Sequence, residues 1–404
     1  MEPEAIYEAL LEPGGIEDPY PLYAALHQHG PAVAAGPGLV LVPGYAAVHA
    51  ILRDPDFGVD DAEVFDRGYP EWRDHPAFYT HGLLGLNGAD HARIRGLLAP
   101  PFAHRRVRPL EPAISRLTDQ LLDAMAELGA GGGPVDFMQE FAYALPMAVI
   151  CELIGVPDCD TSTLRQLARS LTAILEPEID DDVLAEGDAA AVTLAEMLTE
   201  LAADRLARPR DDLISDLAAA ASSEDGRISH SELIQNLILL LVAGFECSAG
   251  LLGNGLRIIF SHPEAGRTLR SGAVTPAAFV EEALRYDGPV QDTGRRKRSP
   301  GEVHGVAVDT DDELVLLIGA ANRDPRRFAD PDAFWPGRTD GGSLSFGGGP
   351  HFCLGAALAR MEGTVAFPRL LRRFPGITNA GEPERRPGVT FRGFERMPVS
   401  LSEQ

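Results

Sequence analysis

The spacing of hydrophobic and polar residues along the 404-residue chain predicts a mostly helical protein with a small β region. We expect a short helix over 21–29, because a proline stands in its first turn. Apolar residues after Gly36-Pro37-Gly38 predict a hairpin. Residues 58–90 show no regular period, and a loop of that length inside a compact domain is usually functional. From 91 to about 220 the apolar spacing is helical.

The clearest predicted element is a long helix from Ser229 to about Phe260. Ser229 and Glu232 fit a capping box, and no proline interrupts the pattern that follows. About 30 residues in a helix span roughly 45 Å. The middle of this helix, residues 237–245, is apolar on all sides, so we expect it to cross the interior of the protein.

The remaining pattern predicts how the chain is organised. Helices are expected over 276–286 and 354–374, with short strands in 288–320 and an aperiodic stretch over 321–350. No repeat and no linker divides the sequence. We therefore expect a single domain over 1–404, mainly α with a small β region. Its β-richer parts are about 30–45 and 288–320, and its helical parts about 88–286 and 354–374.

Composition narrows the functional classes. The chain has 35 Lys and Arg against 60 Asp and Glu, and this net charge of −25 disfavours nucleic acid as a partner. The sequence contains no run of about 18 uncharged apolar residues and no signal-peptide pattern. Four irregularly placed cysteines do not make a disulfide framework. We expect a cytoplasmic protein with no membrane partner.

Candidate chemistry gathers in residues 345–355. Three consecutive glycines let the backbone approach a bulky group, and Cys353 stands where the last helix begins. The positive end of a helix favours a thiolate, which is a nucleophile or a metal ligand. A zinc site is disfavoured because Cys151 and Cys159 lie at the wrong spacing, and a nucleophile lacks a local signature. A buried free cysteine after a glycine turn stays an alternative.

The whole string resembles the haem-binding signature of the cytochrome P-450 family, and every fixed position is matched. These positions are Phe346, Gly347, Gly349, His351, Cys353 and Gly355. Glu282 and Arg285 are similar to the family's Glu-x-x-Arg helix, and Arg338 would complete a structural triad with them. The resemblance covers nearly the whole chain in the correct order and is to the soluble bacterial type.

The resemblance implies a cytochrome P-450 fold with haem b between the long distal helix and the proximal cysteine loop. Cys353 would be the axial thiolate, which pushes electron density toward O–O cleavage. The haem propionates are anions, and the resemblance places four basic residues to bind them. These are His91, Arg95, Arg295 and His351, with Ala243, Gly244, Phe346 and Gly347 as further cofactor contacts. Alone, each basic residue would be read as a solvated charge or a satisfied core histidine.

The distal helix departs from the family pattern of Ala/Gly-Gly-x-Asp/Glu-Thr-Thr. Glu246 keeps the acid, but Cys247 replaces the alcohol, and a thiol is a weak hydrogen-bonding group. Ser248 has a hydroxyl about 100° further round the helix. These three residues are the catalytic candidates. Two outcomes stay open: ordinary C–H hydroxylation, or oxidative coupling of aromatic rings or C–C/C–N bond formation without oxygen insertion. Cys247 as a tolerated small residue is a third interpretation.

Partners follow from the resemblance. Because no flavin or nicotinamide domain is fused, electrons from NAD(P)H would arrive through a ferredoxin and its reductase. Basic residues that could dock an acidic ferredoxin are Arg105, Arg106, Arg108, Arg360, Arg372 and Arg373. Contacts to a small organic substrate, a bacterial secondary metabolite, are expected at Leu239, Val242, Val290, Gln291 and Phe391. We expect a monomer. A peroxygenase and a non-catalytic haem or carrier-binding scaffold are the alternatives.

Overall fold

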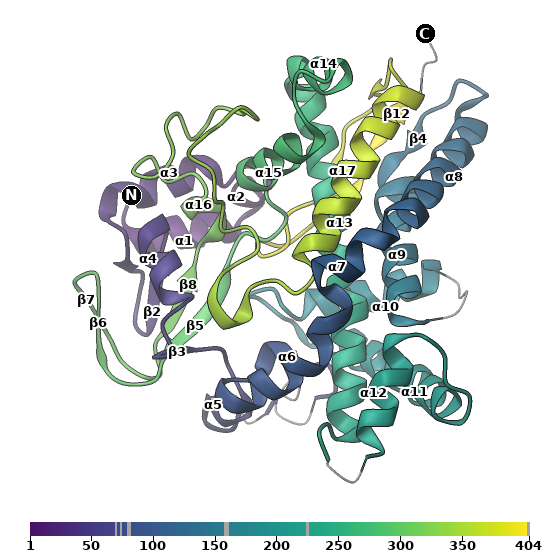
Figure 1. The fold of residues 1–404 in the computed structure, drawn as a ribbon. Helices are drawn as coiled ribbons and strands as arrows, with labels where there is room; N and C mark the ends of the chain where they lie inside the picture. The colour runs from purple at the N-terminus through teal and green to yellow at the C-terminus, as the bar shows by residue number, and fades with distance from the viewer. Residues whose placement is uncertain (69–70, 73–74, 79–81, 157–160, 224–225, 402–404) are drawn as a thin grey trace. The chain divides into compact units, whose positions relative to one another are not determined.

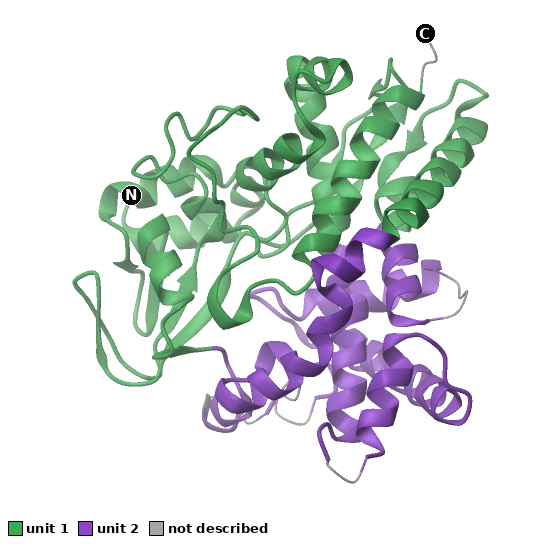
Figure 2. Cartoon of the chain, viewed as in Figure 1, with its two compact units in different colours: residues 1–58, 110–145, 247–404 green, residues 59–109, 146–246 purple. Residues whose placement is uncertain are grey.

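The computed structural model describes residues 1–68, 71–72, 75–78, 82–156, 161–223 and 226–401. The chain divides into two compact units, coloured separately in Figure 2. The first unit holds residues 1–58, 110–145 and 247–404, and the second holds 59–109 and 146–246. The boundary between residues 246 and 247 falls inside one helix, α13 (His230–Ser261). The expected single domain stays a prediction.

The first unit carries many of the helices of the chain. They are α1 (Pro3–Leu11), α2 (Pro13–Glu17), α3 (Tyr20–His29), α4 (Tyr45–Ile51), α8 (Glu111–Gly129), α14 (Pro263–Ser271), α15 (Pro276–Tyr286), α16 (Ile318–Ala321) and α17 (Ala356–Arg373). Short helical turns lie at Met138–Ala142 and Gly349–His351, and another, Arg108–Leu110, spans the boundary between the two units. Helix α17 packs against α8, α14 and α15, so the last helix of the chain is held on several sides.

All described strands lie in the first unit. They are β1 (Val33–Ala34), β2 (Leu39–Val42), β3 (Phe57–Gly58), β4 (Val135–Asp136), β5 (Thr293–Lys297), β6 (Gly301–Val303), β7 (Val306–Val308), β8 (Glu313–Leu316), β9 (Thr378–Asn379), β10 (Glu384–Arg385), β11 (Phe394–Arg396) and β12 (Pro398–Ser400). The largest sheet has the order β1-β2-β8-β5-β3, and its central strands lie side by side in Figure 1. Strands β2 and β8 pair in parallel, with Val40 opposite Leu314, and both side chains are buried in one apolar cluster.

Among its described residues, the second unit contains helices and no strand. Its helices are α5 (Ala62–Gly68), α6 (Gly88–Phe102), α7 (His104–Val107), most of α9 (Ala144–Ile154), α10 (Thr161–Ala173), α11 (Asp181–Ala207) and α12 (Leu213–Ala221), with a single turn at Leu83–Gly85. Helices α10 and α11 make the most extensive pairing, and α12 packs against α11.

Helix α13 begins at the predicted capping box. The Ser229 N–H donates to Glu232 Oε2 over 2.7 Å, and the Glu232 N–H donates to Ser229 Oγ over 3.2 Å. These two bonds satisfy backbone donors that a helix N-terminus leaves open. The helix is long and apolar enough to cross a membrane by length and composition, but 83% of its most apolar window is buried inside the protein. This burial is that of a core helix.

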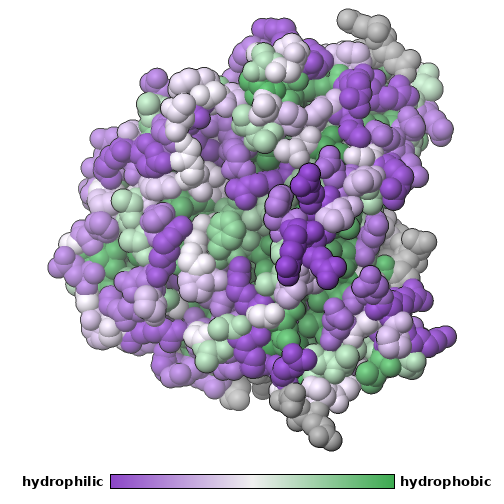
Figure 3. Space-filling view, viewed as in Figure 1, coloured by the Kyte–Doolittle hydropathy of each residue, from purple (hydrophilic) through white to green (hydrophobic). Residues whose placement is uncertain are grey.

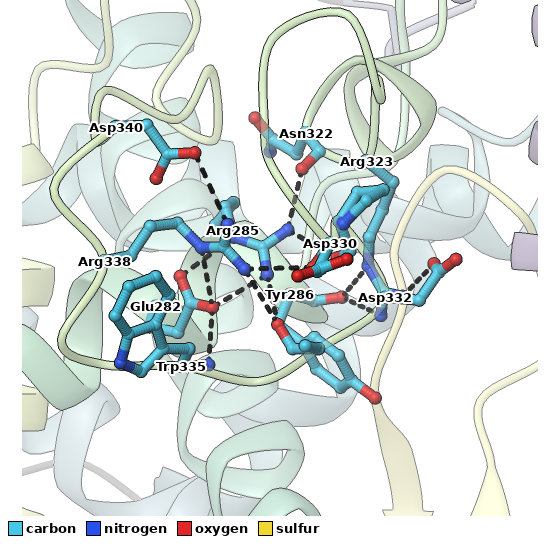
Figure 4. A network of polar contacts seen from close by, with 12 residues as sticks. Glu282, Arg285, Tyr286, Asn322, Arg323, Asp330, Asp332, Trp335, Arg338 and Asp340 are labelled. Carbon is cyan, nitrogen blue, oxygen red and sulfur yellow. Dashed lines mark hydrogen bonds and ion pairs between the residues drawn. The ribbon is translucent and has the colours of Figure 1, made fainter.

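A buried ionic network ties the segment before the cysteine loop to α15 (Figure 4). Arg285 donates two hydrogen bonds of 2.8 Å to the two carboxylate oxygens of Glu282, and Arg338 Nε donates to Glu282 Oε1 over 3.3 Å. Arg285 also donates to the carbonyl oxygens of Asn322 and Pro331. The structure thus brings the three predicted triad residues together, all of them buried.

Several predicted elements are confirmed, and their ends shift by few residues. Helix α3, the β1–β2 hairpin, helices α13, α15 and α17, and the strands within 288–320 form where the pattern places them. The interpretation of residues 58–90 as irregular throughout is wrong, because α5 forms inside this stretch. Helices α1 and α2 and strands β9 to β12 were not predicted, since two- and three-residue strands are too short to show a period.

We predict that Arg285→Met lowers the free energy of unfolding by about 3–5 kcal/mol, because it leaves the buried Glu282 carboxylate without its main partner. Urea denaturation followed by circular dichroism measures the change. The matched control is Arg396→Met, which removes an arginine from a half-exposed pair with Glu384 and should cost less than about 1 kcal/mol. Equal losses in the two variants would contradict the structural role of the network.

Candidate functional site

The loop that precedes Cys353 is held by its own backbone and by the N-terminal part of the chain. The Cys353 N–H donates to the Phe346 carbonyl oxygen over 2.9 Å, which closes the loop onto itself. Gly349 has a φ of 63°, and a Cβ there would lie 2.0 Å from the Leu52 carbonyl oxygen. A side chain at this position is therefore excluded on two grounds, backbone conformation and space. Arg360 of α17 lies over the Phe346 ring, 4.2 Å from its centroid.

This loop presents the Cys353 thiol uncovered. Cys353 is exposed and forms no disulfide, and it lies three residues before the first residue of α17. The partial positive charge at a helix N-terminus favours the thiolate form of a nearby cysteine. Among the described residues, no group of three or more His, Cys, Asp or Glu side chains is placed to hold a metal ion. The loop therefore offers one thiolate and no other protein ligand beside it.

Cys247 of α13 belongs to the same unit and lies close enough to this thiol to interact with it electrostatically. Burial raises the pKa of the Cys247 thiol to about 12, and the negative charge of Cys353 adds to the rise. Cys247 therefore remains a neutral thiol at neutral pH. Ala243, four residues earlier on the same face of α13, is exposed, although the residues around both positions are mostly buried. We call this strip, in which Ala243 is exposed and Cys247 partly exposed, the uncovered strip of the helix.

The other two catalytic candidates on α13 are more buried than Cys247. Glu246 and Ser248 are buried, at 6% and 4% exposure, so the uncovered strip carries a thiol between two buried polar residues. A Cβ on Gly244 would come within 2.5 Å of Ile150 on α9, so this glycine is required by the packing of the two helices. Helix α13 is α-helical from His230 to Ser261, without a bulge at Gly244.

In the first unit, two of the four predicted propionate ligands have defined places. Arg295 is buried on β5, where its Nη1 donates to the Gly294 carbonyl oxygen over 2.6 Å and to Thr293 Oγ1 over 3.1 Å. His351 ends the short turn at Gly349–His351, two residues before Cys353. Their role toward a cofactor stays a prediction.

The other two propionate candidates lie on α6 in the second unit. His91 is buried, and burial lowers the pKa of its imidazole, with the nearby Arg95 charge as a second cause. His91 is therefore neutral at neutral pH. On the same helix, Arg93 pairs with Glu232 at 2.6 Å and so links α6 to the first turn of α13.

The predicted substrate contacts fall into different surroundings. Val290 and Phe391 form an isolated antiparallel bridge, and both are half-buried. Leu239 and Val242 are buried on α13. Gln291 is 1% exposed, donates to the Gly288 carbonyl oxygen and accepts from the Tyr23 hydroxyl. Its amide is thus occupied by the protein itself, which gives it a structural function.

One polar residue at the centre of the first unit was missed by the sequence reasoning. Glu362 of α17 is 1% exposed. The Ser248 hydroxyl of α13 is the polar group that lowers its pKa, against the rise that burial causes. The sequence feature that could have identified Glu362 is its position as an acidic residue within an apolar stretch, nine residues after Cys353. Which face of α17 is buried could not be read from that spacing. Of the ordinary cysteines, Cys151 is buried, and Cys159 lies outside the described residues.

These residues fit a haem group. A porphyrin supplies four nitrogen ligands of its own, so the protein need offer only one axial ligand, and a lone uncovered thiolate meets that need. The uncovered strip carries only small side chains, Ala243 and Cys247, so α13 itself places no bulky group there. A tetrahedral metal site would require further ligands that the described residues do not gather here.

Comparison with known proteins agrees with this geometry. A family model described as "Cytochrome P-450" matches residues 277–391. The chain is 37% identical to cytochrome P-450 107B1 of Saccharopolyspora erythraea over 370 residues, which cover 89% of this chain and 88% of that protein. It is 33% identical to 6-deoxyerythronolide B hydroxylase of the same organism over 399 residues, covering 95% and 96%.

Solved structures show the same fold. Mycobacterium smegmatis CYP164A2, in its ligand-free state, matches with a TM-score of 0.90 and 34% identity, covering 98% of this chain and 100% of that one. The enzyme CxnD, described as acting in C–S bond formation in chuangxinmycin biosynthesis, matches with a TM-score of 0.86 and 29% identity, covering 96% and 95%. With relatives this similar over nearly its whole length, the chain belongs to the cytochrome P-450 family of monooxygenases.

Proposed function

We propose that this cytochrome P-450 hydroxylates a C–H bond of a small organic molecule, with Cys353 as the axial ligand of haem b. The observation that carries the proposal is the exposed Cys353 thiol, which lies at the start of α17 and close enough to Cys247 of α13 to raise the pKa of that second thiol. The relatives support the substrate class, because one of them is named as a hydroxylase of 6-deoxyerythronolide B. We infer a bacterial secondary metabolite as substrate.

When bound, haem would supply the activation of O2 and the acceptance of electrons. The protein's part is to hold and surround that group. Cys353 would ligate the iron, and His91, Arg95, Arg295 and His351 would bind the propionates. Glu246, buried beside the uncovered strip of α13, would hold the protons that the reaction consumes. Cys247 would stay a neutral thiol and donate only weakly.

A second reaction is favoured by one specific observation. Cys247 stands where the family pattern has an alcohol, and the similar enzyme CxnD is described as forming a C–S bond. A site with a weak hydrogen-bond donor at this position suits the removal of hydrogen atoms from a substrate without insertion of oxygen. Product mass spectrometry separates the two reactions, since hydroxylation adds one oxygen atom and oxidative coupling removes hydrogen.

We further infer that electrons come from NAD(P)H through a ferredoxin and its reductase, and that the enzyme works in the cytoplasm. Hydrophilic side chains cover the part of the surface over α17 (Figure 3). Among the proposed docking residues, Arg105, Arg106, Arg108 and Arg372 are exposed, whereas Arg360 pairs with Glu281 and Arg373 with Asp123. Of the three on α17, Arg372 is therefore the one whose charge is most available to an acidic partner.

We predict that Cys353→Ser abolishes the absorption band that is characteristic of reduced, carbon-monoxide-bound haem-thiolate protein. A hydroxyl does not ionise in this environment and is a poor substitute for a thiolate ligand. Visible spectroscopy of the purified variant measures the loss. Cys151→Ser is the control, because Cys151 is a buried cysteine on α9 in the second unit. A thiolate-type band in Cys353→Ser would refute the ligand assignment.

We predict that Glu246→Gln lowers the rate of product formation by about 100-fold, in line with the loss of a positioned proton donor. Product formed per NADPH consumed should fall in the same variant. Cys247→Ala should turn over like the native enzyme, since a thiol contributes little as a donor, and Cys247→Thr serves as the family-like control. Normal turnover by Glu246→Gln would show that the acid has no part in proton delivery.

We predict that turnover driven by ferredoxin falls as the salt concentration rises from about 0.1 M to about 1 M, because screening shortens the reach of surface charges. Arg372→Gln should weaken this dependence, whereas Arg396→Gln, which removes an equal charge from β11, should leave it unchanged. Stopped-flow measurement of haem reduction gives the rate. A rate that does not change with salt would count against docking through arginine residues.

A further inference from the structure

Two segments that are far apart in sequence, 287–292 and 389–393, pair with each other in the first unit. Val290 and Phe391, both proposed substrate contacts, form the isolated antiparallel bridge between them. On either side of this bridge a backbone N–H of one segment donates to a carbonyl oxygen of the other, over 2.9 and 2.7 Å. We call them the paired segments. A pairing this short is not stable by itself, so its position has to be fixed by what it packs against.

The paired segments lie directly on α13. A Cβ on Gly250 would come within 2.7 Å of Pro289 Cβ and within 3.2 Å of the Arg392 carbonyl oxygen, so the helix has no room for a side chain there. Gly250 follows Cys247 by three residues, which is less than one turn of helix. The paired segments therefore border the uncovered strip of α13 at its C-terminal end.

A single buried amide fastens both segments to the helix. Asn254 is 1% exposed, and its Nδ2 donates to the Asp287 carbonyl oxygen over 2.9 Å and to the Arg392 carbonyl oxygen over 3.1 Å. Asn254 Oδ1 makes no hydrogen bond to the described residues, so these two bonds are the polar contribution of the side chain. Seven residues after Cys247, Asn254 falls about 20° short of two full turns and so lies on the face that carries the uncovered strip, roughly 10 Å further along.

The same two residues are joined by a buried ion pair. Arg392 Nε donates to Asp287 Oδ1 over 2.6 Å. The other N–H groups of this guanidinium donate to the carbonyl oxygens of Ile16 and Glu17, over 2.7 and 3.0 Å, and the Tyr20 hydroxyl donates to Asp287 over 2.6 Å. Burial alone would raise the pKa of Asp287, but neighbouring arginine charges hold it below its ordinary value. At neutral pH the ion pair therefore anchors the paired segments to α2 and α3.

Resting on the proposed function, we propose that Asn254 is a positioning residue that sets the place of Val290 and Phe391 relative to the uncovered strip. The ion pair holds the paired segments to the N-terminal helices, and the Asn254 amide holds them to α13. Without that amide two buried carbonyl oxygens lose their donor, which is unfavourable, and the segments are no longer fixed against the helix. Asn254 acts through the backbone and does not itself contact the substrate or the cofactor.

The first test is amide hydrogen exchange of the haem-containing, substrate-free protein, followed by mass spectrometry. Asn254→Ala removes the two donors, and Asn254→Asp removes them without a change of size. In both variants the amide protons of Gln291 and Arg392, which form the hydrogen bonds of the paired segments, should exchange at least about 10-fold faster. Residues 301–308, which form the β6–β7 hairpin, should keep their native rates and so exclude a general loss of structure.

The matched control is Leu256→Ala. This residue is fully buried, and it lies two positions after Asn254, about 200° round the helix, so the substitution removes volume from the opposite face of α13. Exchange of the paired segments should stay native in this control. Native rates in both Asn254 variants, or an equal rise in Leu256→Ala, would overturn the proposal.

The second test uses two probes of different size that bind haem iron, imidazole and 4-phenylimidazole, titrated by the shift of the haem absorption. Asn254→Ala should bind 4-phenylimidazole about 10-fold more weakly, because its ring extends toward segments that are no longer held in place, and imidazole within about 2-fold of the native affinity. Leu256→Ala should leave both affinities native. An unchanged ratio of the two affinities in Asn254→Ala would contradict a positioning role.

The carbon-monoxide spectrum of the same samples tests the proposed function separately. The native protein and both Asn254 variants should show the haem-thiolate band, because Asn254 holds the paired segments and not the cysteine loop. A native protein without the band would refute the haem-thiolate assignment, whereas the exchange rates would still decide whether Asn254 fixes the paired segments. Loss of the band in the variants alone would contradict a role confined to these segments.

Discussion

The structure depends on presenting one thiol uncovered while fixing the backbone that carries it. A loop that exposes a cysteine has no side-chain packing at that point to hold it, so its position must come from its flanks. The bond from the Cys353 N–H to the Phe346 carbonyl, the lack of room beside Gly349 and the stacking of Arg360 on Phe346 provide this support. Glycine is required here because two demands coincide, a left-handed backbone and contact with Leu52.

The ionic network around Glu282 extends that support upstream. Arg285 and Arg338 both bind Glu282, and through Arg285 the carbonyl groups of the segment before the cysteine loop are tied to α15. Helix α15 in turn packs against α17, the helix that begins just after Cys353. Removing one partner leaves a buried charge without its counter-charge, which is strongly unfavourable. The network therefore fixes the position of the segment relative to α15 more than it adds to the free energy of unfolding. The triad therefore acts on the site through the backbone.

Part of this was predictable from sequence, and the limits have physical causes. Helix α13 could be predicted because a capping box precedes a long apolar run. Cys353 could be predicted because every fixed position of the haem-binding signature around it is matched. The terminal strands were missed because pairing of residues far apart in sequence, such as Val399 with Val135, decides them. Glu362 was missed because its burial depends on Phe367 and Leu251 closing over the neighbouring glycines, which is a property of helix packing.

Three consecutive polar residues on α13 differ in chemistry and in what surrounds them. Along α13 an acid, a thiol and a hydroxyl follow one another at Glu246, Cys247 and Ser248. The Cys247 thiol stands where the family pattern has an alcohol, and burial together with the negative charge of Cys353 keeps it neutral. Successive helix positions differ by about 100°, so Ser248 reaches α17 instead.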